Sequence, residues 1–181
     1  MNEDPIMLFE ASNVPSRHRK VKPDFNTPWG TMFSTVSESL ESNSSVIIAI
    51  GDRGRGKTQM GVELVRKFCR DGKTAYFTTA LRFFMDMQDA FRTDERNDTI
   101  DFFIKPRLLV IDEAHERSNS DWEDRMLAMV VNERYQELRS TLVIANYSEE
   151  EVEKHLNPSI LSRAEESGGI VVFDWESFRS R

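Results

Sequence analysis

Short apolar runs alternate along the chain with longer segments in which apolar residues recur at helical spacing. The runs predict five strands, and the first of them, VIIAI, is apolar throughout. Such a run is typical of a strand that is covered on both faces of a sheet. The predicted strands cover residues 46–50, 74–78, 108–112, 141–146 and 170–173.

Helices are predicted between the strands, where apolar residues lie three and four positions apart. They cover 57–70, 81–91, a long segment after Ser120, a segment after Ser148 and a segment that opens at Pro158. Glu123 and Glu151 each stand three residues after a serine, which is the spacing of a capping box. Strands that alternate with helices indicate one α/β domain with a parallel sheet covered on both faces.

The N-terminal part follows a different pattern. Residues 1 to about 28 contain Pro5, Pro15 and Pro23 and show no sustained period, so we expect an extended arm with turns. A short amphipathic helix around Val36 follows. We therefore divide the chain into an arm with a short helix, residues 1–44, and a main domain, residues 45–181.

The segment GDRGRGKTQM follows directly on the first strand and opens a helix. Its first eight residues fit the phosphate-loop pattern G-x-x-x-x-G-K-[ST] in the strand–loop–helix context that this pattern requires. Glycines let backbone N–H groups turn toward phosphate oxygens, Lys57 reaches the terminal phosphates, and Thr58 offers a hydroxyl to Mg²⁺. We expect ATP and Mg²⁺ here, bound by Gly51, Asp52, Arg53, Gly54, Arg55, Gly56, Lys57, Thr58 and Gln59.

Two carboxylates stand where the strand LLVID ends. Asp112 and Glu113 lie at the edge where parallel sheets bind ligands. Asp112 suits a role in holding Mg²⁺, and Glu113 suits polarising an attacking water. A small phosphate-loop kinase needs no such glutamate, so the pair favours hydrolysis; the alternative is two surface carboxylates.

The acidic pair and the two residues after it, 112–115, form the string DEAH, which also names a class of nucleic-acid helicases. Those enzymes close two lobes on the nucleotide, and 181 residues are too few for both. We therefore interpret the match as coincidence and His115 as an exposed loop residue. Asn146 ends the next strand, where it either orients the attacking water or senses the γ-phosphate, or is a turn residue.

Charge and composition narrow the function classes. The net charge of −7 argues against tight, unassisted binding to nucleic acid, and the basic cluster SRHRKVK is expected to be a solvated segment. Cys69 is the only cysteine, which excludes an internal disulfide and a cysteine zinc cluster. The apolar runs are far shorter than the roughly 20 residues that span a bilayer, so we expect a cytoplasmic protein with no membrane partner.

Several stretches resemble the AAA+ ATPases and, within them, the DnaC/IstB group of bacterial helicase loaders and transposition helper ATPases. They are GDRGRGKT, LLVIDEAHE, NERYQELRSTLVIAN, LNPSILSRAEESGG and VVFDWESFRSR. The first two are generic to phosphate-loop ATPases, and the run from 132 to 181 narrows the family. The resemblance implies an AAA+ fold with a five-stranded parallel sheet flanked by helices, over roughly residues 45–181.

The resemblance also implies roles for single residues. Lys57 and Thr58 would belong to the Walker A motif, and Asp112 and Glu113 to the Walker B motif. Asn146 would be sensor 1. Arg163 would be the arginine finger that reaches a neighbouring subunit's γ-phosphate, and Arg179 would be sensor 2, acting on its own nucleotide. A finger supplied in trans completes the active site only between subunits, so the resemblance implies self-association through the ATP site.

Together these features predict an ATP-binding and ATP-hydrolysing switch of slow turnover. It would assist the loading of a replicative helicase on single-stranded DNA, which it would itself bind only weakly. Two alternatives stay open: a transposition helper that binds duplex DNA and a transposase, and a non-hydrolysing ATP-dependent adaptor. Phe83, Phe84 and Phe91 are expected mostly in the core, with stacking on bases as the alternative.

Overall fold

The computed structural model describes residues 4–42, 44–93 and 95–178. Its five strands form one sheet in the order β2-β3-β4-β1-β5, and every neighbouring pair is parallel, which confirms the predicted sheet. The strands are β1 (Val46–Ile50), β2 (Ala75–Thr79), β3 (Leu108–Asp112), β4 (Ser140–Ile144) and β5 (Gly169–Val172).

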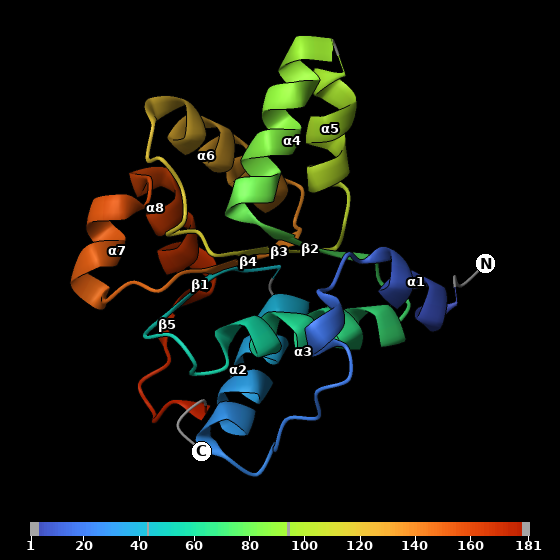
Figure 1. Ribbon diagram of the computed structural model, residues 1–181, viewed down its shortest axis with the longest axis vertical. Coiled ribbons are helices and arrows are strands. Elements are labelled where there is room, and N and C mark those ends of the chain that lie inside the picture. The colour runs from blue at the N-terminus through green and yellow to red at the C-terminus, as the bar shows by residue number, and fades with distance from the viewer. Residues whose placement is uncertain (1–3, 43, 94, 179–181) are drawn as a thin grey trace.

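Helices cover both faces of this sheet, as Figure 1 shows. One face carries α4 (Ala80–Thr93), α5 (Arg96–Ile104), α6 (Asp121–Gln136), α7 (Glu149–His155) and α8 (Pro158–Ser167). The other carries α1 (Pro5–Ala11), α2 (Pro28–Ser42) and α3 (Lys57–Arg70). Both predicted capping boxes are present, at Ser120 and at Ser148.

Each face of the sheet has its own apolar core. Alternate residues of β1 divide between them: Ile48 packs with α4 to α8, and Ile47 packs with α2 and α3. Phe83 and Phe84 are buried in the first core, as expected for most of the aromatic residues of this helix. Phe91 is 42% exposed and lies against Trp122 and Arg96.

Two helices were not predicted from the pattern. α1 lies inside the segment expected to be extended, where the Asp4 side chain caps the helix and Pro5 takes its first position. A single 3-10 turn follows it at Ser16–His18. α5 was missed because RNDTIDFFI is short and mostly polar, and it buries only Phe103.

The N-terminal arm runs along the edge strand of the sheet. The N–H of Phe77 in β2 donates to Ser12 O (2.8 Å), and the side-chain amide of Asn13 donates to Phe77 O (3.0 Å). The arm therefore satisfies backbone groups that an edge strand otherwise leaves open. Val14 and Trp29 lie in the same core as α3, and the division of the chain after residue 44 stays a prediction.

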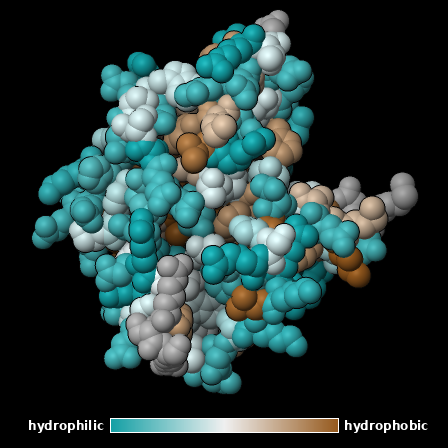
Figure 2. All heavy atoms as spheres, viewed as in Figure 1, coloured by the Kyte–Doolittle hydropathy of each residue, from teal (hydrophilic) through white to brown (hydrophobic). Residues whose placement is uncertain are grey.

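The surface drawn in Figure 2 is largely hydrophilic, with small groups of hydrophobic spheres. Exposed apolar side chains include Leu81 and Met85 on α4, and Ile6 and Met7 on α1. Across the described ranges, the helices are all too short or too polar to cross a membrane.

Candidate functional site

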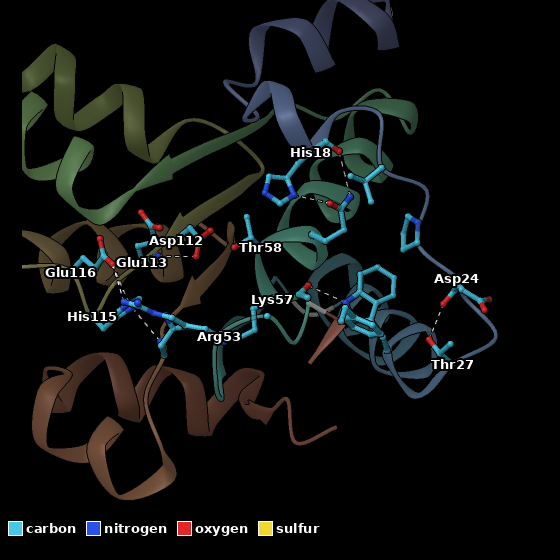
Figure 3. A pocket seen from close by; sticks show the side chains of 18 residues that line it. His18, Asp24, Thr27, Arg53, Lys57, Thr58, Asp112, Glu113, His115 and Glu116 are labelled. Carbon is cyan, nitrogen blue, oxygen red and sulfur yellow. Dashed lines mark hydrogen bonds and ion pairs between the residues drawn. The ribbon is translucent and has the colours of Figure 1, made fainter. Parts of the chain in front are cut away.

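A cavity of about 580 Å³ opens at the carboxyl ends of β1, β3 and β4 (Figure 3). This edge of a parallel sheet is where α/β proteins bind ligands, and the volume suits a ligand of nucleotide size. The phosphate loop, the acidic pair and Asn146 all reach the cavity, although they come from three strands. The sheet order therefore brings together residues that are far apart in the sequence.

The phosphate loop, residues 51–56, joins β1 to α3 through backbone angles that favour glycine. Gly51, Gly54 and Gly56 have φ values of 126°, 83° and 87°. A Cβ on Gly51 would lie 2.4 Å from Phe173 O, and one on Gly56 would lie 2.8 Å from the indole nitrogen of Trp29. At these two positions, glycine is required both by the backbone angle and by the closeness of a neighbour.

Donors from outside the loop bind three successive carbonyls within it. Phe178 N donates to Gly54 O (2.9 Å), the indole of Trp175 to Arg55 O (3.0 Å), and the indole of Trp29 to Gly56 O (3.0 Å). Gly51 N donates to Tyr147 O (3.0 Å), and the carbonyls held on the three donors fix the rest of the loop, so that its other N–H groups can turn toward an anion. The sequence analysis missed both tryptophans; the available signal was that a buried indole N–H needs an acceptor.

Lys57 opens α3 and is 5% exposed. Its ammonium group donates to Gly51 O (2.6 Å) and Asp52 O (2.7 Å), so the side chain folds back along the loop. The charge is therefore held over the loop, beside the positive end of the α3 dipole. This arrangement suits a cation that receives phosphate oxygens.

Thr58 and Asp112 meet across the cavity. Burial raises the pKa of Asp112, which is 5% exposed, and hydrogen bonds from the Thr58 hydroxyl and the Glu113 N–H oppose that rise. A hydroxyl and a carboxylate are hard oxygen donors, and Mg²⁺ is usually held by few protein oxygens together with phosphates and waters. These two residues fit Mg²⁺, and the described residues contain no larger metal-binding cluster of histidine, cysteine or carboxylate groups.

Glu113 follows Asp112 in a left-handed backbone conformation, with φ of 57°. Such a conformation is uncommon for a residue with a side chain and is found at sites where the surrounding structure fixes it. Burial raises the pKa of Glu113, and the charges of Asp112 and Glu116 raise it further. A carboxylate with a raised pKa is a better base for polarising water.

His115 was expected to be an exposed loop residue, and the structure shows that this was wrong. Its side chain is only 14% exposed and lines the cavity. Asn146 N lies 3.2 Å from His115 Nδ1, and the Asn146 side-chain amide lies 2.8 Å from His115 Nε2. No local pattern indicates this contact, because it joins the loops after β3 and β4.

The N-terminal arm forms the wall opposite the acidic pair, which the sequence analysis did not foresee. His18, Val21, Pro23 and Trp29 line the cavity. His18 Nδ1 lies 2.8 Å from the side-chain oxygen of Gln59, so the arm is joined to α3 directly after the loop. Part of the basic segment at 16–22 therefore faces the cavity.

Not every predicted residue reaches the cavity. Asp52 and Arg55 turn away from it: their side chains pair with each other (2.5 Å), and Arg55 also donates to Phe173 O (2.8 Å). Asn146 lies in the loop beyond β4 and not in the strand, which ends at Ile144. Gly51 shapes the loop without lining the cavity. The remaining predicted loop residues line the cavity: Arg53, Gly54, Gly56, Lys57, Thr58 and Gln59.

The two arginines assigned by resemblance lie elsewhere. Arg163, on α8, does not line the cavity; it pairs with Glu166 (3.0 Å) and lies 4.8 Å from the Tyr135 ring centroid. Its side chain is 33% exposed. Arg179 lies outside the described residues.

A parallel sheet with a phosphate loop after β1, an acidic pair after β3 and a polar residue after β4 is the fold of an AAA+ phosphate-loop ATPase domain. The family described as IstB-like ATP binding protein matches residues 31–181. The chain therefore belongs to this family of ATP-binding proteins.

A curated relative is similar to this chain in sequence, and solved structures are similar to it in fold. The replicative helicase loader DnaC of Escherichia coli K12 is 26% identical over 147 residues, which are 80% of this chain and 60% of that protein. The chain thus spans less than two thirds of the curated relative that it matches. A DnaI structure has a TM-score of 0.74 at 13% identity, covering 93% of this chain and 98% of that one. AMPPCP-bound DnaA from Aquifex aeolicus has a TM-score of 0.72 at 16% identity, covering 86% and 49%.

Proposed function

We propose that this chain is an ATP-hydrolysing switch that assists the loading of a replicative helicase on single-stranded DNA and that works as an oligomer. The observation that carries the ATP part is that Thr58 and Asp112, the two candidate Mg²⁺ ligands, line the same cavity beside Glu113 (Figure 3). The Lys57 ammonium group, held over the phosphate loop, would receive the terminal phosphates of ATP.

Each residue of the cavity has a separate task in this proposal. Thr58 and Asp112 would hold Mg²⁺, which supplies neutralising charge for the phosphates. Glu113 would polarise the attacking water, for which its raised pKa is suited. Asn146 would donate a hydrogen bond to that water or to the γ-phosphate. Residues 45–181 would form the ATPase domain, with the arm at 1–44 as an addition to it.

The proposed oligomer rests on the roles that the family resemblance gives to two arginines. Arg163 would serve a neighbouring subunit's γ-phosphate, with which its place outside its own cavity is compatible, and Arg179 would act on the nucleotide of its own chain. A site completed in this way makes hydrolysis depend on assembly. Slow turnover would suit a switch whose bound ATP holds subunits together and whose hydrolysis releases them.

The helicase part of the proposal is supported by the names of the relatives. DnaC is described as a replicative helicase loader, and a solved DnaC helicase loader has a TM-score of 0.70 with this chain at 17% identity. A DnaA structure bound to AMPPCP and single-stranded DNA has a TM-score of 0.73 at 14% identity. A replicative helicase and, more weakly, single-stranded DNA are therefore the proposed partners.

A second candidate function is favoured by the family match itself. The family is described as IstB-like, and a transposition helper of that group would bind duplex DNA and a transposase. Equilibrium binding to matched single-stranded and duplex oligonucleotides in the presence of ATP separates the two functions. Preference for the single strand supports the loader, and preference for the duplex supports the transposition helper.

The direct test is affinity capture from native cells with Glu113→Gln, which keeps the ATP-bound state, followed by mass spectrometry. Lys57→Ala is the nucleotide-free control, and Glu153→Gln, on the exposed face of α7, is the charge-matched control. We expect a hexameric replicative helicase with Glu113→Gln and its loss with Lys57→Ala. Recovery of a transposase overturns the loader function, and recovery of the chain alone favours an adaptor.

A further inference from the structure

The two ring nitrogens of His115 each contact Asn146, one at the backbone N–H and the other at the side-chain amide. The backbone N–H of Asn146 lies 3.2 Å from Nδ1, and the side-chain amide lies 2.8 Å from Nε2. The ring also lies edge-on to Tyr147, with centroids 6.2 Å apart. With 14% of its side chain exposed, His115 is packed in one orientation against the loop that carries Asn146.

The backbone contact decides which tautomer the ring adopts. A backbone N–H can only donate, so Nδ1 must be the bare, accepting nitrogen. A neutral imidazole then carries its proton on Nε2, and burial lowers the pKa of His115 in favour of this neutral form. The opposite tautomer and the charged ring would each point Nδ1–H at the N–H of Asn146.

This tautomer in turn decides which end of the Asn146 amide faces His115. A Nε2–H can only donate, so the amide must offer its oxygen, which a half-turn of the carboxamide brings to this position. The NH₂ group is then left for the cavity. A phosphate oxygen or the oxygen of an attacking water can accept from that NH₂ group, whereas an amide oxygen in its place would repel a phosphate.

The same ring connects to the phosphate loop. His115 Nε2 lies 3.6 Å from a carboxylate oxygen of Glu116, and that oxygen lies 3.3 Å from the guanidinium of Arg53. Both of these residues also line the cavity. The loops after β1, β3 and β4 are therefore joined through one carboxylate and one imidazole at the mouth of the site.

We propose that His115 is a positioning residue that holds the Asn146 carboxamide with its NH₂ group toward the bound nucleotide. This inference rests on the proposed function, because it assigns the direction in which Asn146 acts during hydrolysis. His115 is the fourth residue of the DEAH string, and the role proposed for it does not depend on helicase activity.

Two conservative variants separate the two contacts of the ring. The Gln amide nitrogen in His115→Gln can take the place of Nε2–H and donate to Asn146, whereas the Asn oxygen in His115→Asn can replace only the acceptor Nδ1. His115→Phe removes both contacts while it keeps a ring against Tyr147. His155→Phe is the matched control, because His155 is exposed and stacks on the ring of Tyr147.

Single-turnover hydrolysis and ATP affinity are measured for all four variants. We expect His115→Phe and His115→Asn to lower the hydrolysis rate constant by roughly 10- to 100-fold while the Kd for ATP changes by less than about threefold. His115→Gln should recover most of the rate, and His155→Phe should equal the wild type. In an Asn146→Ala background, His115→Phe should have no further effect, because both changes remove one interaction. Full activity of His115→Phe, or additive effects, would overturn the proposal.

A measurement on the imidazole itself tests the inference apart from the ATPase activity. Nitrogen–proton NMR correlation of the ring in the full chain distinguishes the Nε2–H tautomer from the Nδ1–H tautomer. The proposal requires Nε2–H at neutral pH, and an Nδ1–H or charged ring overturns it. If the tautomer is Nε2–H and the wild type hydrolyses no ATP under any condition, the positioning geometry stands and the proposed hydrolytic function fails.

Discussion

The indole nitrogen of Trp29 donates a hydrogen bond to the carbonyl oxygen of Gly56, 3.0 Å away, and so ties α2 to the last residue of the phosphate loop. Trp29 is 2% exposed, and its ring lies against those of Phe25 and Phe33. The N-terminal part of the chain thus shapes the phosphate site directly, beyond covering one face of the sheet.

Trp29→Phe tests this contact. The variant keeps an aromatic ring against Phe25 and Phe33, loses one hydrogen bond, which is a net loss of about 0.5–1.5 kcal/mol, and leaves part of the indole site empty. We expect ATP affinity to fall by roughly two- to tenfold in isothermal titration and the melting temperature to fall by several degrees. Trp122→Phe, which changes a tryptophan on α6 away from the loop, is the control and should bind like the wild type. Equal affinities of the two variants would show that the Trp29 contact does not shape the loop.

Lys57→Ala removes the cation held over the phosphate loop. Because the ammonium group would neutralise the terminal phosphates, we expect ATP binding to fall below detection in titration with a slowly hydrolysed analogue. Lys154→Ala, on an exposed position of α7, should bind normally. Retained ATP binding by Lys57→Ala would place the nucleotide elsewhere.

Arg163 can be tested by mixing two inactive variants. Arg163→Ala keeps Glu113, and Glu113→Gln keeps Arg163, so an oligomer that contains both has some complete sites if the finger acts in trans. We expect hydrolysis to be low in each variant alone and to recover in the mixture. Arg125→Ala, an exposed arginine of α6, should behave like the wild type. Failure of the mixture to recover would argue against a trans role.

Substitution of Arg134 is expected to lower the free energy of unfolding without a direct effect on catalysis. The guanidinium is fully buried and donates to acceptors at the end of α5, before β3 and at the start of β4: Phe103 O, Ile104 O, Pro106 O, Ser140 O and Thr141 Oγ1. Arg134→Met leaves these groups without a donor, so we expect a loss of roughly 3 kcal/mol or more in urea unfolding. Arg134→Lys should recover little, because an ammonium group cannot reproduce the planar array of donors. A loss below 1 kcal/mol in both would contradict this role.

The buried thiol of Cys69 is expected to react slowly with alkylating reagents in the folded protein. Burial raises the pKa of this thiol to about 11, so the folded protein carries almost no thiolate at pH 8. We expect iodoacetamide to leave the native chain unmodified at pH 8 and to modify it fully in urea. The raised pKa favours the folded state below the unfolded value of about 9, and this contribution is lost as the pH rises toward 11. Rapid labelling of the native chain would contradict the burial.

Features formed by residues that are close together in the chain could mostly be predicted from the sequence. The phosphate loop, the acidic pair after β3 and the capping boxes at Ser120 and Ser148 each lie within a few residues of the element they form. The parallel sheet followed from apolar strands that alternate with helices. The short polar helix α5 carried no comparable pattern, and its packing against α4 and α6 stabilises it instead.

Contacts between distant segments could not be predicted from the sequence. His115 meets Asn146 only because β3 and β4 are neighbours in the sheet, and Trp29 reaches Gly56 across 27 positions. His18 faces the cavity because the arm crosses α3, which no local spacing indicates. The walls of the site are thus fixed by strand order and chain path, while its phosphate loop is fixed by sequence.

The most direct test of the central claim is ATP turnover by Glu113→Gln, measured with the Kd for ATP on the same protein. We predict a Kd within about threefold of the wild type and a rate constant for hydrolysis at least about 100-fold lower, since the glutamine cannot polarise the attacking water. Equal hydrolysis by the two proteins would contradict the assignment of this site.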